Sequence, residues 1–483
     1  MTAVVTEARR VRYSLDSSLG RLSPSERTER GRAARAEVPR EAHAAFERLP
    51  EQPDPLSLLS AQAATRLPDL VPVRWGRMLA SPFSYYRGAA LPMASDLAHT
   101  PVSGLPVQAC GDAHLSNFGI FGSAERRLVF DVNDFDETLP GPWEWDVKRL
   151  AASMEVAARD NGFSGKERRQ IVLSTVTRYR QAMRDFARIT TLDVWYAHAD
   201  ADQLQADFQG QLSKRQRKLL SKNLVKAKTR DSMQEVGKLC NVVDGRPRII
   251  ADPPLIVPVD ELLPRQVDRK AFEAQITDLL SKYRRTLETD RRHLLDGYEF
   301  ADMARKVVGV GSVGTRCWIV LMFGRDENDP LFLQVKEAEE SVLSHFVGAT
   351  KFANQGQRVV AGQRLMQASS DIFLGWQRIE AGLDGRQRDF YVRQLRDWKF
   401  SVDVQAMIPS GLEMYGKLCG WTLARAHARS GDRIAIAAYL GGSDVFDQAI
   451  AQFAVSYADQ NERDYQSLVR AVSDGQITAE TGT

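Results

Sequence analysis

A glycine-rich turn between two apolar segments places the strongest limit on how this chain can fold. Its sequence is KVVGVGSVGTR (residues 306–316), and the apolar run CWIVLMF follows directly. A dinucleotide-binding fold requires a helix at that point, whereas this run predicts a second strand. We therefore expect a β-hairpin whose loop carries Gly309, Gly311, Ser312 and Gly314. Backbone amides of such a loop can approach a phosphate because glycine has no Cβ.

A lysine ends the strand that we predict next. In the segment LFLQVKEA, Lys336 follows apolar residues at the alternating positions Leu331, Leu333 and Val335. Two interpretations of this pattern stay open. Lys336 is either an edge residue whose stem covers apolar surface while its amine stays in water, or a cation that binds phosphate groups.

Acidic residues gather in two short segments earlier in the chain. The segment CGDAHLSN (residues 110–117) is followed by LVFDVNDFD (residues 128–136), in which a predicted strand runs into three acids. Their oxygens are hard ligands, which suit Mg²⁺ or Mn²⁺ better than zinc. The candidate ligands are Asp112, Asn117, Asp131, Asp134 and Asp136. Each alone could equally cap a helix or turn, but together they favour a cation site. His114 has no second histidine at ligand spacing, which favours a bracing role in the loop.

These spacings resemble those of kinase-like phosphotransferases, most closely the aminoglycoside and choline kinase branch. The step from Asp112 to Asn117 is that of their catalytic loop, and the later DFD triplet resembles their metal-binding segment. The resemblance implies that Asp112 orients and deprotonates an acceptor hydroxyl, while Asn117, Asp134 and Asp136 hold magnesium. It also implies that Asp146, at the start of the next helix, braces the catalytic loop.

Two departures from that pattern leave alternatives open. Cys110 stands where a histidine is usual, and the interval from Asn117 to Asp134 is longer than usual. Because of the longer interval, Asp131 or Asp136 could hold the metal in place of Asp134.

The glycine-rich hairpin and the lysine strand resemble the small lobe of the same kinases. We expect strands, a helix over residues 337–349 and a hairpin over residues 372–395, which is the order of elements in that lobe. Glu339 and Glu340 lie too near Lys336 in sequence to be its usual acidic partner, so the partner is unassigned. The catalytic-loop motif precedes this lobe instead of following it. The resemblance therefore implies a circular permutation, which a fold tolerates when the chain is cut at an exposed loop.

The predicted fold class is α+β, a protein-kinase-like two-lobed fold that is circularly permuted and carries extra helices. We expect a mobile basic arm over residues 1–55, then a mainly helical large lobe with the acids over residues 56–300. The β-rich small lobe follows over residues 301–398, and C-terminal helices over residues 399–483 complete the large lobe. The predicted helix over residues 412–428 resembles the one that leads into the catalytic loop of kinases.

Composition excludes several other classes of protein. Lys and Arg number 65 against 62 Asp and Glu, and a net charge of +3 argues against a nucleic-acid footprint over the whole chain. A basic helix that we expect over residues 201–230 is by default a solvated surface. No apolar run approaches a membrane span, and the N-terminus lacks the apolar core of a secretory signal. The 4 cysteines lie far apart without a CxxC motif, which favours a reducing, cytoplasmic location.

Four longer strings resemble a bacterial family known as domain of unknown function 2252. They are SPFSYYRG (residues 81–88), GDAHLSNFG (111–119), NDFDE (133–137) and VVAGQRLMQ (359–367). The resemblance spans roughly residues 56–472 and implies no established activity. Arg87, in the first string, is either a contact for a phosphate or an acidic substrate, or a member of a buried ion pair.

Three functions are compatible with these patterns. The first is a phosphotransferase that uses ATP and Mg²⁺ and acts on a hydroxyl acceptor, preferably a small molecule; transfer of AMP by the same residues stays open. The second is a nucleotide-binding pseudokinase without catalysis. The third is a metal-dependent phosphoesterase built on Asp112, His114, Asp131 and Asp134. The expected partners of the first are the nucleotide and the acceptor, not a membrane or a nucleic acid. It requires the acids to face the glycine-rich loop and Lys336 across one cleft.

Overall fold

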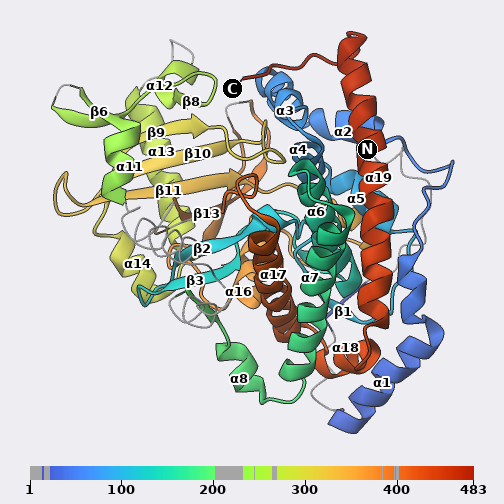
Figure 1. Cartoon of the computed structure of the whole chain (residues 1–483). Helices are drawn as coiled ribbons and strands as arrows, with labels where there is room; N and C mark the ends of the chain where they lie inside the picture. The colour runs from blue at the N-terminus through green and yellow to red at the C-terminus, as the bar shows by residue number, and fades with distance from the viewer. Residues whose placement is uncertain are drawn as a thin grey trace.

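The computed structural model describes residues 13–15, 22–201, 232–243, 245–263, 269–382, 384–395, 398 and 402–482. Within these ranges the chain is a mixed α+β protein, as the sequence predicts. A six-stranded sheet forms one side of the molecule and long helices form the other (Figure 1). The short strands β2 (Phe118–Gly122) and β3 (Leu128–Val132) lie between the two parts (Figure 1).

The six-stranded sheet is antiparallel, with the strand order β12-β13-β11-β10-β9-β8. Its strands are β8 (Ile256–Pro258), β9 (Glu299–Lys306), β10 (Cys317–Phe323), β11 (Pro330–Glu337), β12 (Gly375–Ile379) and β13 (Arg388–Gln394). Most residues of β10 and β11 are buried, which explains the near-continuous apolar runs in their sequences. The register pairs Cys317 with Lys336, so the lysine lies beside the end of the glycine-rich loop.

Five helices form the core on the other side. They are α6 (Trp143–Asp160), α7 (Gly165–Phe186), α17 (Pro409–Ser430), α18 (Arg433–Leu440) and α19 (Val445–Ser473). Helix α7 packs against each of the other four. It approaches α17 closely because Gly416 and Gly420 face Thr175, and a Cβ at either glycine would collide with that residue. Apolar side chains of these helices fill the largest hydrophobic cluster of the protein.

Shorter helices precede this core. They are α1 (Pro24–Glu37), α2 (Pro55–Ala63), α3 (Val71–Met78), α4 (Pro82–Gly88) and α5 (Ala90–Leu97). We expected a mobile arm over residues 1–55, whereas α1 packs against α18. Gly31 permits this contact because it has no Cβ to collide with the backbone of Ala435. Arg27 Nε also lies 2.8 Å from Asp432 Oδ1.

The remaining elements connect the two parts. β1 (Pro106–Ala109) pairs with β4 (Leu139–Pro142), β3 pairs with β5 (Ala199–Asp200), and β6 (Cys240–Val243) pairs with β7 (Arg246–Ile249). The other α-helices are α8 (Thr191–Tyr196), α11 (Ser232–Leu239), α12 (Val259–Leu262), α13 (Arg269–Arg284), α14 (Thr289–Leu295), α15 (Ser344–Val347) and α16 (Gln355–Met366). Because β1 leads into the first acidic segment and β4 follows the second, their pairing brings both segments together.

Three expectations differ from the structure or lie outside it. Of the helix predicted over residues 337–349, only the short α15 forms, over residues 344–347; β11 extends through residue 337, and the long helix comes later, as α16, which Asn354 caps. β8 hydrogen-bonds to β9, so the sheet begins before the lobe boundary that we placed at residue 300. Residues 202–230 of the predicted basic helix lie outside the described residues.

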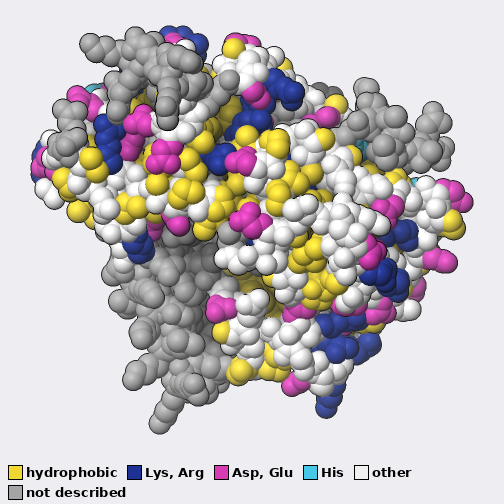
Figure 2. Space-filling model, turned by 90° about the horizontal axis from the view of Figure 1, so that it is seen from above, with side chains coloured by type: hydrophobic (Ala, Val, Ile, Leu, Met, Phe, Trp, Pro, Cys, Tyr) yellow, Lys and Arg dark blue, Asp and Glu magenta, His cyan; other side chains and the backbone are white. Residues whose placement is uncertain are grey.

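Among the described helices, none combines the length and the apolar character that crossing a membrane requires. On the face shown in Figure 2, Lys and Arg side chains are interspersed with Asp and Glu. Neither sign of charge dominates that face, in keeping with the net charge of +3.

Candidate functional site

The loop that follows β1 is held by the first turn of α6. Asp146 accepts hydrogen bonds from the backbone amides of Cys110 (2.6 Å) and Gly111 (3.0 Å). Its Oδ2 also lies 3.0 Å from His427 Nε2 on α17. Gly111 has a φ of +80°, and a Cβ there would collide with Glu137, so the turn requires glycine. These contacts confirm that Asp146 braces the loop, as the kinase resemblance implies.

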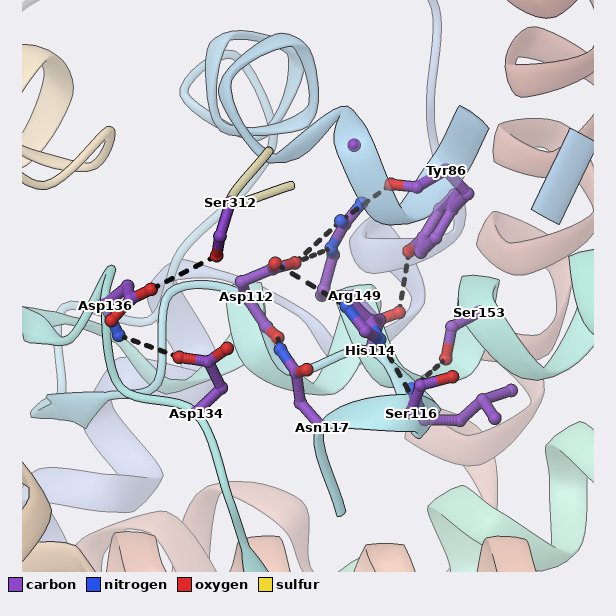
Figure 3. Close-up of polar contacts among 12 residues, drawn as sticks. Tyr86, Asp112, His114, Ser116, Asn117, Asp134, Asp136, Arg149, Ser153 and Ser312 are labelled. Atoms are coloured by element: carbon purple, nitrogen blue, oxygen red, sulfur yellow. Dashed lines mark hydrogen bonds and ion pairs between the residues drawn. The ribbon is translucent and has the colours of Figure 1, made fainter. Parts of the chain in front are cut away.

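Asp112 projects from this loop toward an arginine of α6. Arg149 Nε donates to Asp112 Oδ1 at 2.8 Å, and Arg149 Nη2 donates to the carbonyl oxygen of Tyr86 at 2.8 Å (Figure 3). Burial raises the pKa of Asp112, although the charge of Arg149 acts in the opposite direction. The side chain remains 21% exposed and lines the smaller of the two cavities described below.

Two further residues fix the shape of the loop. His114 Nδ1 accepts a hydrogen bond from the backbone amide of Ser116 at 3.2 Å, and burial lowers the pKa of His114 well below its usual value. His114 is therefore a neutral brace, as predicted. Asn117 Nδ2 donates to the backbone carbonyl of Asp112 at 2.7 Å. The backbone carbonyl of Asn117 accepts from the backbone amide of Asn133 at 2.8 Å. The second bond ties the loop to the DFD segment.

The three acids at the end of β3 and directly after it have different surroundings. Asp131 is 2% exposed, forms an ion pair with Arg425 on α17 and accepts a hydrogen bond from the amide of Ala368. Asp136 Oδ1 accepts from the Tyr391 hydroxyl at 2.6 Å. Asp134 is the most exposed of the three, at 31%. Of the alternatives that the sequence leaves open, Asp131 is bound elsewhere, whereas Asp134 faces both cavities described below.

Lys336 reaches the same acids from the sheet. Its Nζ lies 2.5 Å from Asp136 Oδ2 and 3.7 Å from Asp134 Oδ1, while the side chain is only 3% exposed. Burial acts to lower the pKa of Lys336, but the two carboxylates raise it well above its usual value. For Asp136, burial acts to raise the pKa, and the charge and hydrogen bond of Lys336 lower it overall. Lys336 is thus a buried cation and not an edge lysine, and Asp136 is the partner that the sequence left unassigned.

The glycine-rich loop between β9 and β10 lies over this pair. Ser312 Oγ is 3.5 Å from Asp136 Oδ2 (Figure 3). Gly309 and Gly314 have positive φ angles of 67° and 89°, a conformation that favours glycine. The N-terminal helices hold the loop from outside: Arg77 Nη1 donates to the Gly309 carbonyl at 2.6 Å.

Two cavities adjoin the cluster. One of about 120 Å³ lies between the glycine-rich loop and the acids, and one of about 760 Å³ is lined by residues of β11, β13 and α16, Lys336 among them. The two share Arg87, Asp134, Gly309 and Ser312. The smaller cavity is also lined by Asp112, Asn117, Asp136 and Gly311. Gly314 lines neither cavity: its carbonyl accepts the amide of Leu67 at 2.8 Å, which docks that end of the loop on the N-terminal helices.

Sequence reasoning missed three residues that complete the cluster. Arg393 Nη1 donates to the carbonyl of Asn133 at 2.9 Å, and Tyr391 pairs with Lys336 in the register of β13 and β11. The alternation of side chains along β13 is the signal that could have found both residues. Arg358 of α16 donates to the carbonyl oxygens of Asp136, Thr138 and Glu339. Helix α16 thus holds the acidic segment through an arginine, whereas the kinase resemblance implied an acidic partner for Lys336.

Together these features define an α+β protein with a polar cavity between a glycine-rich loop, a buried lysine and a cluster of acids. The model of a bacterial family, described as an uncharacterized protein conserved in bacteria (DUF2252), matches residues 66–471. The chain belongs to this family, as the sequence resemblance indicates. No curated protein and no solved structure matches the chain.

Proposed function

We propose that this protein is a kinase-like phosphotransferase that moves a phosphoryl group from ATP to the hydroxyl of a small molecule. The observation that carries the proposal is the 2.5 Å contact between Lys336 and Asp136, two residues separated by 200 positions in the chain. It brings the strand lysine to the acids beneath the glycine-rich loop. Phosphoryl transfer depends mainly on positioning and on charge stabilisation, and this arrangement supplies both.

Lys336 and the glycine-rich loop are the nucleotide-binding part of the proposal. The ammonium group is buried and charged, Gly309 and Ser312 line both cavities, and Gly311 lines the smaller one. A triphosphate would accept hydrogen bonds from these amides and offset the charge of the lysine.

The acids meet the chemical requirements of a magnesium site that the nucleotide completes. Among the described residues, no three Asp, Glu, His or Cys side chains form a metal site by themselves. Mg²⁺ is commonly held by one or two carboxylates together with substrate phosphates and water, and Asn117 and Asp134 offer such oxygens at the smaller cavity. A magnesium ion held there would neutralise phosphate charge. We assign Asp136 to the orientation of Lys336 in preference to a place in the metal site, because the lysine already occupies its Oδ2.

Asp112 is the proposed base. Arg149 holds one of its carboxylate oxygens, which fixes the orientation of the side chain, and the raised pKa makes the carboxylate a better proton acceptor. Asp112 would accept the proton of the acceptor hydroxyl while the oxygen attacks the terminal phosphate.

The order of the elements supports a permuted kinase-like fold. β9, the glycine-rich loop, β10, β11 with its lysine, α16 and the β12–β13 hairpin follow one another as in a kinase small lobe. Ser430, at the end of α17, accepts a hydrogen bond from the amide of Gln108 in β1 at 3.1 Å. The last residue of α17 therefore lies beside the strand that leads into the acid loop, as a permutation at that junction requires.

A thermal-shift titration with ATP and Mg²⁺ tests the proposal. The variants are Asp134→Asn and Lys336→Ala. The matched control is Arg470→Met, because Arg470 is an exposed residue of α19 that donates to Ser467 of the same helix. We expect ATP to raise the melting temperature of wild type and of the control by about 2 °C or more at saturation, and to have little effect on the two variants. Absence of a shift in folded wild type would remove the proposal.

Two other results would favour an alternative function over phosphoryl transfer. Binding of ATP without product formation against a broad panel of acceptors would indicate a pseudokinase. Full phosphate-releasing activity in Lys336→Ala would indicate a metal-dependent phosphoesterase, for which the glycine-rich loop and the lysine have no role.

A further inference from the structure

Arg87 differs from the other arginines around the cavities. Among the described residues, its Nε has no hydrogen-bond partner, and no carboxylate lies within ion-pair distance of its guanidinium. The neighbouring arginines each donate to an oxygen of the protein. Arg149 donates to the carboxylate of Asp112. The other three donate to backbone carbonyls: Arg66 to that of Val313, Arg77 to that of Gly309 and Arg393 to that of Asn133. Arg87 thus differs from these four arginines in that neither a carbonyl nor a carboxylate oxygen of the described residues accepts a hydrogen bond from it.

The position of Arg87 is fixed by the helix that carries it. Ser81 caps α4 by accepting the amide of Ser84 at 3.1 Å, and the Tyr86 hydroxyl donates to the carbonyl of Arg149 at 2.7 Å. The carbonyl of Arg87 lies against Gly311, where a Cβ would stand 3.3 Å from it. The end of α4 is thus held between α6 and the glycine-rich loop.

Arg87 lines both cavities, together with Asp134, Gly309 and Ser312. The charge of Asp112 acts on it without an ion pair, and burial lowers the pKa of Arg87 overall. A buried polar nitrogen without a partner, such as the Nε of Arg87, is unfavourable, and the planar fork of arginine matches the oxygens of a phosphate. The missing anion is therefore expected where Asp112, Asp134 and the glycine-rich loop meet.

We propose that Arg87 binds the terminal phosphate of the nucleotide and makes the site discriminate between ATP and ADP. This inference rests on the proposed function. The inner phosphates belong to Lys336 and the loop amides, whereas Arg87 lies on the side of Asp112, where the group to be transferred must meet the acceptor. A nucleotide that lacks the terminal phosphate leaves Arg87 unpaired.

Isothermal titration of ATP and ADP, each with Mg²⁺, tests the assignment. The proteins are wild type, Arg87→Met, Arg87→Lys and the control Arg470→Met. We expect Arg87→Met to weaken ATP binding by about ten- to a hundredfold and ADP binding by less than about twofold, with no change in the control. Equal ATP-to-ADP affinity ratios in Arg87→Met and wild type would overturn the inference while leaving ATP binding, and the proposed function, intact.

The melting temperature of the ligand-free protein distinguishes a binding role of Arg87 from a structural one. Removing an unpaired buried charge should leave the melting temperature of the ligand-free protein unchanged or raise it, and a marked fall would overturn the assignment. If Arg87→Met does not fold, Arg87→Lys decides: lysine keeps the charge without the fork, so ATP binding should weaken about three- to tenfold. An unchanged ATP-to-ADP ratio in that variant would overturn the assignment.

Titration with tripolyphosphate distinguishes failure of the Arg87 assignment from failure of the proposed nucleotide-dependent function. If wild type binds neither ATP nor ADP, the nucleotide proposal fails. Tripolyphosphate binding by wild type that Arg87→Met loses would then support Arg87 as a phosphate ligand without a nucleotide. No binding of tripolyphosphate by wild type in that case would overturn the Arg87 assignment as well.

Discussion

Asp131 and Asp134 stand three residues apart at the end of β3, and their surroundings are opposite. Asp131 is 2% exposed and paired with Arg425, whereas Asp134 is 31% exposed and lies 3.7 Å from the nearest cation. A second pair of acids shows the same contrast. Asp146 of α6 is 1% exposed and accepts two backbone amides of the loop after β1, whereas Asp112 of that loop is 21% exposed. We call Asp131 and Asp146 the paired acids, and Asp112 and Asp134 the cavity acids.

The contrast separates acids that hold the fold from acids that can act on a ligand. A buried carboxylate persists only when hydrogen bonds and opposite charge offset its desolvation. The paired acids satisfy this condition with protein groups alone, so they have little capacity left for a ligand. Both cavity acids line the smaller cavity, and Asp134 also lines the larger one, so a ligand in these cavities can contact them.

The largest expected effect concerns a cavity acid and catalysis. Asp112→Asn should lower the rate of ATP consumption at saturating ATP by about 10²–10⁴-fold, because the amide cannot accept a proton. The amide oxygen can still accept the bond from Arg149, so the variant should remain folded. Urea denaturation provides the control, and a folded variant with a rate within twofold of wild type would contradict the role of Asp112.

A paired acid should affect stability instead. Asp131→Asn should lower the free energy of unfolding by about 3–5 kcal/mol, because Arg425 is left buried without its counter-charge. Urea denaturation measures the loss. The double variant Asp131→Asn with Arg425→Met should recover much of it, since both charges are then removed. A loss below about 1 kcal/mol in the single variant would break the distinction between the two classes.

The matching change at a cavity acid should be small. Asp134→Asn should change the free energy of unfolding by less than about 1 kcal/mol, because this carboxylate is partly solvated and has only a distant cation. The same variant should lose the stabilisation by ATP and Mg²⁺. A loss of stability comparable to that of Asp131→Asn would place Asp134 among the paired acids.

Glu137 lies at the border between the two classes and gives the smallest effect. Burial raises its pKa from the ordinary value of 4.5 to about 7, although the amide of Val342 opposes the shift. Between these values the folded state binds more protons than the unfolded chain, so stability should fall as the pH rises through this window.

Denaturation of wild type and Glu137→Gln from pH 4 to pH 8 measures this contribution. Glutamine does not titrate, so the difference in stability between the two proteins should change with pH between about 4.5 and 7. A constant difference across the window would show that Glu137 has an ordinary pKa.

Elements with strong local signals could be predicted from the sequence. The hairpin around residues 309–314 and the position of Lys336 at a strand end follow from glycines and from apolar runs, which act locally. The bracing role of His114 is also local, because it accepts the amide of Ser116. The role of Asp146 was implied by the kinase resemblance and not by a local signal, since its partner Cys110 is 36 residues away. The helix placed over residues 337–349 forms only over residues 344–347. Pairing of β11 with β13 extends the strand through residue 337, and the amide of Ala338 donates to the carbonyl of Asp389, which are contacts between distant segments.

The sequence by itself determined which residue types stand at the ends of strands and in the turns, because backbone propensity and the absence of a Cβ act within a few residues. Only the tertiary structure decided which acid meets which cation. Asp131 pairs with Arg425 and Asp136 with Lys336, across intervals for which the sequence has no local signal. A buried charge is stable only beside its partner, and that partner is set by how the helices and the sheet pack.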